Sequence, residues 1–88
     1  MERYYLISYD IADNRIRGYF FRKLKKIAIH MQKSVFMFNG ALEQLSALEI
    51  EFCKKLQADD NVLIMPCSKI SYEEARIYSG KKKTTVVC

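Results

Sequence analysis

The order of hydrophobic patterns along the chain predicts an α+β fold, a ferredoxin-like βαββαβ sandwich with an extra C-terminal strand. Aromatic and branched side chains run through residues 4–9 and branched ones through 62–65, which is typical of strands. Between them, apolar side chains recur with a helical period in residues 15–29 and 41–57. With 88 residues, the chain has room for a single domain.

A short polar loop separates the first strand from the first helix. The strand over residues 4–9 ends at Asp10, and Asp13 or Asn14 can cap the helix through a side-chain oxygen. Gly18 weakens this helix by about 1 kcal/mol relative to Ala and permits the close approach of another backbone. The core-facing stripe of the helix consists of Ile16, Phe20, Leu24 and Ile27.

The rest of the chain supplies the remaining elements. Residues 33–40 provide two short strands or one bent strand, and either of these gives the ferredoxin-like order. The strand over 62–65 stops at Pro66, and residues 75–79 and 84–87 are predicted as terminal strands. The second helix has its own apolar stripe, which consists of Leu42, Leu45, Leu48, Phe52 and Leu56.

Both faces of the predicted sheet are apolar. In the first strand, Leu6 points to one face while Tyr5 and Ile7 point to the other. Two helices cover only one face, so we expect a homodimer to bury the second; the alternative is amphipathic packing with exposed tyrosines. We expect one domain over residues 1–88, with its core at 3–67 and a strand-exchange segment at 70–88 that adds to the partner's sheet edge.

The balance of charge favours a polyanionic partner. The chain carries 15 Lys and Arg against 10 Asp and Glu, a net charge of +5, and the excess is concentrated in residues 1–39. Nucleic acid is the commonest partner of such a surface, and a solvated helix face without a partner is the alternative. In the first helix, the basic stripe consists of Arg15, Arg22 and Lys26.

The cysteines and the hydropathy pattern favour a cytoplasmic protein without a membrane partner. Cys53, Cys67 and Cys88 are widely spaced, which indicates reduced thiols and excludes a zinc-ligand pattern. No segment approaches the roughly 20 apolar residues of a membrane span. The single histidine, His30, excludes a pair of histidines acting as acid and base within one chain.

Asp10, at the carboxyl end of the first strand, is the sharpest candidate for chemistry. One carboxylate in this place is commonly only a helix cap, but Mg²⁺ binds through one or two carboxylates and keeps waters or phosphates as its other ligands. In a symmetric dimer, two copies of Asp10 meet near the axis and hold one ion. The ion then polarises a phosphodiester and lowers the pKa of water.

Three segments resemble the CRISPR-associated Cas two family. The first strand and loop, Tyr5-Leu6-Ile7-Ser8-Tyr9-Asp10-Ile11-Ala12-Asp13, is similar to the family's opening strand, which ends in Tyr-Asp-Ile. The basic helix with Arg15, Arg17 and Arg22 follows, and then Gln32-Lys33-Ser34-Val35-Phe36, which matches Gln-x-Ser-Val-Phe. The resemblance covers residues 4–67 and includes the strand Asn61-Val62-Leu63-Ile64-Met65-Pro66-Cys67.

This resemblance implies a ferredoxin-like homodimer with C-terminal strand exchange. It also implies a role in spacer acquisition with the Cas integrase, and Mg²⁺-dependent endonuclease activity on single-stranded RNA or double-stranded DNA, with Mn²⁺ as an alternative ion. Asp10 is then the catalytic residue and the metal ligand. Arg17 contacts the scissile phosphate; Arg15, Arg22 and Lys26 contact the nucleic-acid backbone. The residues expected to position the site are Tyr9, Ser34 and Phe36.

Two other functions remain as alternatives. One is a duplex-DNA-binding adaptor in the integrase complex, in which Asp10 has no catalytic role. The other is a toxin ribonuclease of the virulence-associated D type, a family that shares the small fold and an early aspartate.

Overall fold

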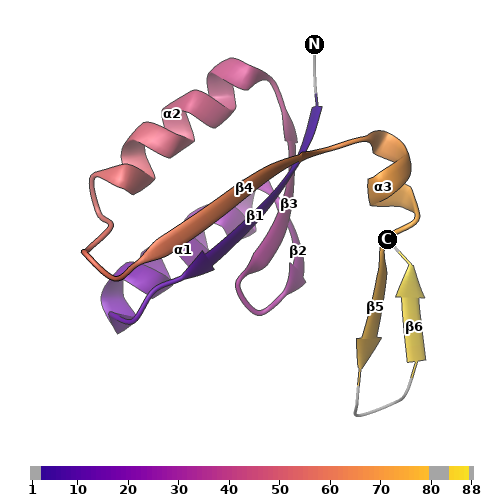
Figure 1. The fold of residues 1–88 in the computed structure, drawn as a ribbon, viewed down its shortest axis with the longest axis horizontal. Coiled ribbons are helices and arrows are strands. Elements are labelled where there is room, and N and C mark those ends of the chain that lie inside the picture. Colours follow the sequence, from indigo (N-terminus) through magenta and orange to yellow (C-terminus); the bar gives the residue numbers. More distant parts are fainter. Residues whose placement is uncertain (1–2, 80–83, 88) are drawn as a thin grey trace.

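The computed structural model describes residues 3–79 and 84–87 and has the predicted α+β fold (Figure 1). The core elements are β1 (Arg3–Asp10), α1 (Asn14–Ile27), β2 (Ile29–Gln32), β3 (Val35–Gly40), α2 (Leu42–Cys53) and β4 (Asn61–Cys67). The C-terminal elements are α3 (Lys69–Glu73), β5 (Arg76–Ser79) and β6 (Thr84–Val87). The βαββαβ order of the first six elements confirms the ferredoxin-like prediction.

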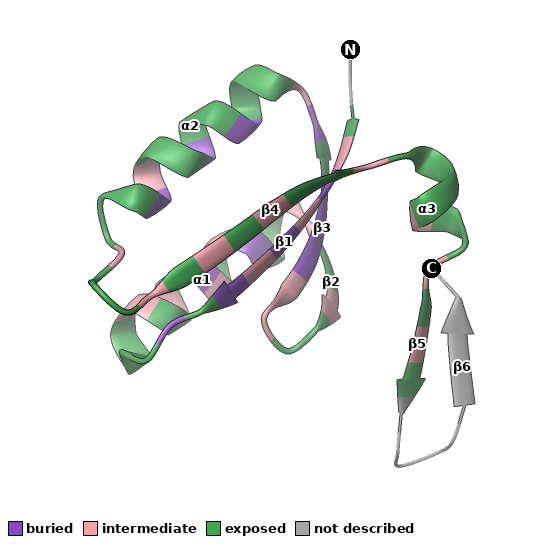
Figure 2. Cartoon of the chain, viewed as in Figure 1, coloured by how far each residue is buried: buried purple, intermediate pink, exposed green. Residues whose placement is uncertain are grey.

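β1 lies at the centre of an antiparallel sheet with the strand order β2-β3-β1-β4. It pairs with β3 on one side and β4 on the other, so that Ile7 is opposite both Phe36 and Ile64. Because successive residues of a strand point to opposite faces, this register puts Tyr5, Ile7 and Tyr9 on the face that α1 and α2 cover. Figure 2 shows the buried residues concentrated in β1, β3 and parts of the two helices.

The two helices meet through stacked aromatic rings. Phe20 of α1 and Phe52 of α2 are fully buried, and their ring centroids are 3.9 Å apart. Leu24, Leu45 and Leu48 are buried in the same cluster. The two predicted apolar stripes therefore face the core, as the helical periods indicated.

The helices are shorter than predicted. α1 ends at Ile27 rather than residue 29, and α2 ends at Cys53 rather than residue 57. Two outer members of the stripes, Ile27 in the last turn of α1 and Leu42 in the first turn of α2, are exposed. None of the described helices is long and apolar enough to span a membrane.

Residues 29–32 leave the helix because they pair with β3. The backbone N–H of Ala28 still donates to the Leu24 carbonyl over 2.8 Å, but the backbone of Ala28 is already extended. β2 then runs antiparallel to β3, with a register shift between His30 and Gln32. Residues 33–40, predicted as two short strands or one bent strand, thus contain the turn at 33–34 and the second strand of a hairpin. The first strand of this hairpin begins earlier, at Ile29.

Gly18 accommodates a side chain, and the expectation that another backbone approaches it is wrong. Nη1 of Arg22 lies 3.1 Å from the place that a Cβ on Gly18 would occupy. Since Arg22 is one helical turn further along α1, its guanidinium folds back along the helix. The glycine therefore leaves room for the Arg22 guanidinium beside the helix.

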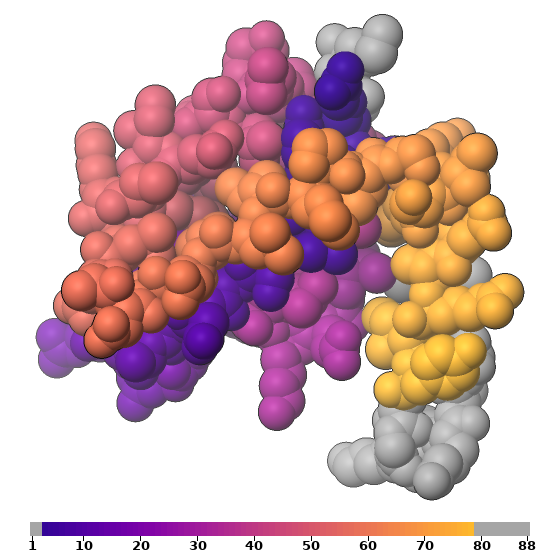
Figure 3. Space-filling model, viewed as in Figure 1, coloured from indigo at the N-terminus to yellow at the C-terminus, as the bar shows by residue number. Residues whose placement is uncertain are grey.

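The second face of the sheet is apolar and carries neither α1 nor α2. We define this open face by residues that are paired across the strands, namely Leu6, Ser8, Ile29, Val35, Met37, Leu63 and Met65; of these, Met37 is buried within the chain itself. Leu63, Met65 and Ile29 are 55%, 47% and 45% exposed. Figure 3 shows β4 and part of β1 at the front of the molecule, with no helix over them. Apolar residues on both faces of the sheet were predicted, and the structure has them.

β4 continues to Cys67, although the sequence predicted a stop at Pro66. Pro66 lies opposite Tyr5 of β1. Proline has no N–H to donate, and it is tolerated here because β4 is an edge strand with one unpaired side.

The chain after β4 forms a short helix followed by two strands. The hydroxyl of Ser68 accepts from the N–H of Ser71 over 3.0 Å and starts α3, a helix that the sequence did not predict. Tyr72 of α3 stacks on Tyr4 of β1, with centroids 4.7 Å apart. β5 and β6 occur where terminal strands were predicted and pair with each other, separately from the four-stranded sheet.

Candidate functional site

Asp10 is exposed at the end of β1, opposite Asn61 of β4. It is two residues after Ser8, so the alternation of the strand puts it on the side of the open face. Among the described residues, no cation forms an ion pair with its carboxylate. Asp10 therefore presents a free carboxylate to solvent.

The helix cap that follows is Asp13, so the alternative that Asp10 caps α1 does not hold. Oδ1 of Asp13 accepts from the N–H groups of Arg15 and Ile16 over 2.8 and 3.0 Å. These two contacts satisfy N–H groups that the first helical turn leaves without partners. The structure thus separates a structural carboxylate at residue 13 from an uncommitted one at residue 10.

A second carboxylate ties the same loop to the opposite connection. Asp60 accepts from the N–H of Ala12 over 3.4 Å and from the N–H of Gln57 over 2.9 Å. It joins the β1–α1 loop to the α2–β4 connection. The backbone next to Asp10 is therefore held from two directions.

Arg17 braces the loop through hydrogen bonds of its guanidinium. Its Nη1 donates to the carbonyls of Ile11 and Ala12 over 2.9 and 3.1 Å, and its Nη2 donates to Oδ1 of Asn14. Most of its donors are thus used by the protein, although a contact with a scissile phosphate was expected of it. The positive charge still faces the neighbouring side chains, including Tyr9.

The three residues expected to position the site lie together. The N–H of Tyr9 donates to the carbonyl of Ser34 over 3.2 Å, and the Tyr9 ring stacks on Phe36 with centroids 6.3 Å apart. Burial raises the pKa of the Tyr9 phenol above 10, and the charge of Arg17 partly opposes this shift. Tyr9 therefore remains a neutral hydroxyl at physiological pH.

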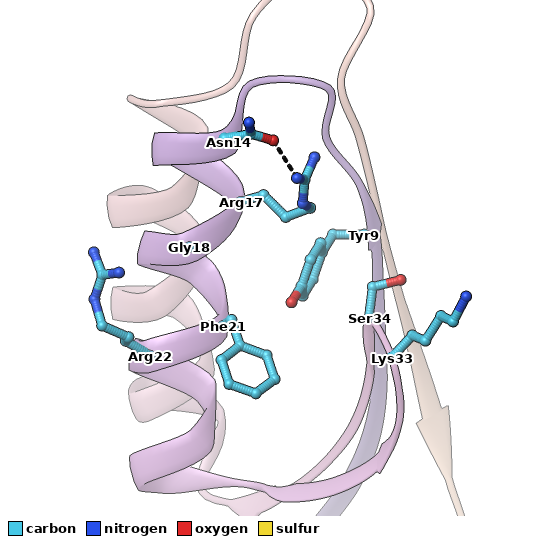
Figure 4. A pocket seen from close by; sticks show the side chains of 8 residues that line it. All are labelled: Tyr9, Asn14, Arg17, Gly18, Phe21, Arg22, Lys33 and Ser34. Carbon is cyan, nitrogen blue, oxygen red and sulfur yellow. Dashed lines mark hydrogen bonds between the residues drawn. The ribbon is translucent and has the colours of Figure 1, made fainter.

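A cavity of about 600 Å³ lies beside these residues, between α1 and the turn at residues 33–34. We call it the α1 pocket. Its lining residues are Tyr9, Asn14, Arg17, Gly18, Phe21, Arg22, Lys33 and Ser34. Figure 4 shows the Tyr9 hydroxyl and the Phe21 ring between α1 and the strands, with Arg17 above them and Arg22 folded along the helix.

The predicted basic residues do not form one cluster. Arg17 and Arg22 line the α1 pocket, whereas Arg15 lines a separate hollow with Tyr19 and Lys55. Nζ of Lys55 lies 4.4 Å from the centroid of the Tyr19 ring, a cation–π contact. Lys26 is exposed in the last turn of α1.

Sequence reasoning missed Phe21 and Gly18 as pocket residues. Gly18 and Arg22 are four residues apart on a helix, and this spacing was a usable signal that their side chains would be neighbours. The place of Lys33 beside the pocket had no such signal, because it depends on where the turn between β2 and β3 lies.

The described residues of one protomer contain no cluster of metal ligands. Within residues 3–79 and 84–87, no three His, Cys, Asp or Glu side chains gather closely enough to hold an ion. Cys53 and Cys67 are free, and Cys88 and the lysines at 81–83 lie outside the described residues. Asp10 is therefore a single hard oxygen ligand, and it suits an ion that takes its other ligands from elsewhere.

The fold and sequence together define the class of protein. Residues 1–75 match the family of the CRISPR associated protein Cas2, and the chain belongs to this family. This confirms the resemblance to the Cas two family and favours it over the virulence-associated D alternative.

Two relatives illustrate the similarity. The chain is 34% identical over 65 residues to the CRISPR-associated endoribonuclease Cas2 1 of Francisella tularensis subsp. novicida strain U112; the match covers 73% of this chain and 67% of the relative. It also resembles the crystal structure of a hypothetical protein, TT1823, from Thermus thermophilus, with a TM-score of 0.73 and 24% identity. That likeness covers 90% of both chains and supports the fold.

Proposed function

We propose that the chain is a metal-dependent endonuclease of CRISPR adaptation, which cleaves single-stranded RNA or double-stranded DNA as a cytoplasmic homodimer and acts with the Cas integrase. Family membership and the endoribonuclease name of the Francisella relative support a CRISPR-associated nuclease role. The observation that carries the proposal is the exposed carboxylate of Asp10, which no described cation neutralises.

The apolar open face supports a homodimer. Leu63, Met65 and Ile29 expose about half of their surface on a face that the core helices do not cover. Two copies packed through this face around a two-fold axis would remove these side chains from water. Asp10 lies on the same side of β1, so the two carboxylates would border one interface.

Mg²⁺, or Mn²⁺ in its place, fits a pair of Asp10 carboxylates. These ions prefer oxygen ligands, and Mg²⁺ commonly binds through one or two carboxylates and retains several waters. When bound, the ion supplies polarisation of the phosphodiester and a lowered pKa of water. The protein's own part is to hold the Asp10 backbone in place through the contacts of Asp13, Asp60 and Arg17.

The exposed cations of α1 support backbone binding without sequence preference. Arg15, Arg22 and Lys26 form no ion pair with the described acids. Salt weakens such binding: for each phosphate contacted in duplex DNA, a tenfold rise in salt concentration lowers the logarithm of the binding constant by about 0.9. We expect binding that weakens steeply with salt and changes little between sequences.

Cleavage by the purified protein tests the catalytic part of the proposal. Labelled single-stranded RNA and double-stranded DNA are incubated with the wild type and with Asp10→Asn, with Mg²⁺, with Mn²⁺ and with EDTA. We expect metal-dependent cutting that Asp10→Asn abolishes. Asp59→Asn is the matched control, because Asp59 is an exposed carboxylate whose side chain holds no described contact; equal loss in both variants would contradict a specific role of Asp10.

The dimer is tested separately. Leu63→Lys puts a charge on the open face, and light scattering is expected to show a monomer. Ile50→Lys is the control, because Ile50 is equally apolar and 61% exposed, but lies on α2. A wild-type monomer at micromolar concentration would refute the homodimer.

A non-catalytic adaptor is the second candidate. The exposed α1 cations favour it, because phosphate binding by Arg15 and Lys26 requires no catalysis. In this case, the wild type binds duplex DNA in a salt-dependent manner but cuts neither substrate, and Asp10→Asn supports spacer acquisition with the integrase as well as the wild type does.

A further inference from the structure

The α1 pocket is lined by positively charged side chains and by no acidic one. Arg17, Arg22 and Lys33 line it, and no Asp or Glu does. None of these three cations forms an ion pair with a described carboxylate. The guanidinium of Arg22 makes no hydrogen bond with a described residue and lies over Gly18, where a Cβ would be 3.1 Å from its Nη1. An anion would find an uncompensated positive rim here.

The same pocket is lined by the half-buried Phe21 ring and by the hydroxyl of Tyr9, which has no hydrogen-bond partner among the described residues. Tyr9 is only 5% exposed, and its hydroxyl, which points toward the pocket in Figure 4, makes no hydrogen bond with a described residue. The Phe21 ring is half-buried, and edge contacts with His30 at 5.1 Å and Phe36 at 5.8 Å fix its plane. A neutral donor and a fixed apolar ring thus lie next to the cations.

These features match one kind of ligand, a planar base linked to a phosphate. We propose that the α1 pocket binds a single unpaired nucleotide, with the base against Phe21 and the Tyr9 hydroxyl, and the phosphate at Arg22 in the positive field of Arg17. A cavity of about 600 Å³ is within the range of small-molecule sites, about 300–1,000 Å³. Stacking on aromatic side chains and contacts from Arg are the usual means of holding unstacked bases.

The pocket is distinct from the proposed metal site. Asp10 is not among its lining residues, and the pocket residues come from α1, the end of β1 and the β2–β3 turn. Nucleotide binding is therefore expected whether or not the chain cleaves nucleic acid. The Asp10→Asn variant, which removes cleavage, should bind the nucleotide as the wild type does.

Calorimetric titration of the full chain tests the pocket. The probes are 5′-AMP and inorganic phosphate. We expect 5′-AMP to bind about tenfold more tightly than phosphate, because only AMP offers a base to stack. Phe21→Leu should remove about tenfold in AMP affinity and leave phosphate binding unchanged, whereas Arg22→Gln should weaken both ligands. Arg76→Gln, an exposed arginine on β5, is the matched control and should change neither.

Folding of the variants is checked by circular dichroism. Phe21 contacts the core, so Phe21→Leu is informative only if its melting curve is cooperative. Arg22→Gln and Tyr9→Phe give independent tests. The first changes an exposed side chain and the second removes only the unpartnered hydroxyl, for which we expect a several-fold loss of AMP affinity.

Two sources of the nucleotide are distinguished by duplex probes. A duplex with a one-nucleotide overhang is compared with the same duplex with blunt ends. Tighter binding of the overhang, lost in Phe21→Leu and competed by AMP, identifies the end of a strand as the ligand. AMP binding without a preference for the overhang identifies a free mononucleotide. Equal affinity for AMP and phosphate, or AMP binding that is unchanged in both Phe21→Leu and Arg22→Gln, overturns the proposal.

Discussion

Phe20→Ala removes the ring on which the packing of both helices depends. Phe20 is fully buried, stacks on Phe52 at 3.9 Å and meets the edge of Tyr9 at 5.6 Å. Truncation to Ala removes both ring contacts and leaves a cavity between α1, α2 and β1. Changes of this kind cost about 3–5 kcal/mol.

This loss is large compared with the stability of a domain of this size. At about 0.05–0.15 kcal/mol per residue, 88 residues give a free energy of unfolding of about 4–13 kcal/mol. With a urea slope of about 1.5 kcal/mol/M, the midpoint of unfolding should fall by about 2–3 M. Phe20→Leu refills part of the space and should cost about 1–1.5 kcal/mol.

Urea unfolding followed by circular dichroism measures these differences. All variants are compared at one protein concentration, because dimerisation would stabilise the folded state by mass action. Ile50→Ala is the control; its side chain is exposed on α2, and the change should stay within about 0.5 kcal/mol. A loss below about 1.5 kcal/mol for Phe20→Ala would refute the reasoning, since it would mean that the helices close over the missing ring.

Three further predictions concern single side chains. Asp13→Ala should cost about 1 kcal/mol in urea unfolding, because the first turn of α1 loses its cap. Gly40→Ala should cost about 1–3 kcal/mol in the same assay, because the new Cβ would lie 2.7 Å from Cζ of the buried Phe38 ring. Burial raises the pKa of Tyr9, so its contribution to stability is full below pH 10 and is lost as the pH rises through the raised value. The difference in ultraviolet titration between the wild type and Tyr9→Phe should show this phenol ionising late, and later still in Arg17→Gln.

Each of these has its own control. Asp13→Asn keeps an oxygen acceptor and should retain most of the stability; a loss as large as that of Asp13→Ala would contradict the cap. If Gly40→Ala left the free energy of unfolding unchanged, the Phe38 ring would have to move aside freely, which would contradict the tight packing at Gly40. A Tyr9 phenol that ionises at the ordinary tyrosine pKa would contradict its burial.

The sequence correctly predicted those elements in which the hydrophobic pattern matches the packing in the fold. β1 and β3 are runs of aromatic and branched residues, and both form central strands. The apolar period correctly identified Phe20 and Leu24 as core residues of α1. The end of the first helix was predicted wrongly. The helical period of apolar residues continues to Ile29, and no Gly or Pro interrupts it. In the structure, however, Ile29 pairs with β3 and belongs to a strand.

For the candidate site, the sequence identified residues but not their partners. Asp10 and Tyr9 stand out beside the strand end in the sequence itself. The use of Arg17 as a brace depends on where the Ile11 and Ala12 carbonyls point, which only the folded loop determines. The start of α3 had one signal in the sequence, because serine is a preferred N-cap residue and Ser68 caps this helix.

The central position of β1 has a consequence for protein synthesis. β1 is made first and can pair with β3 once residue 40 has left the ribosome, but its other edge waits for Asn61 to Cys67. At about 5–20 residues per second, this interval lasts about 1–5 s. During it, the backbone of β1 offers unpaired N–H and C=O groups to any neighbouring nascent chain. A translational pause between residues 40 and 61 would prolong this exposure, so the speed of decoding over α2 bears on how much of the chain reaches its native state.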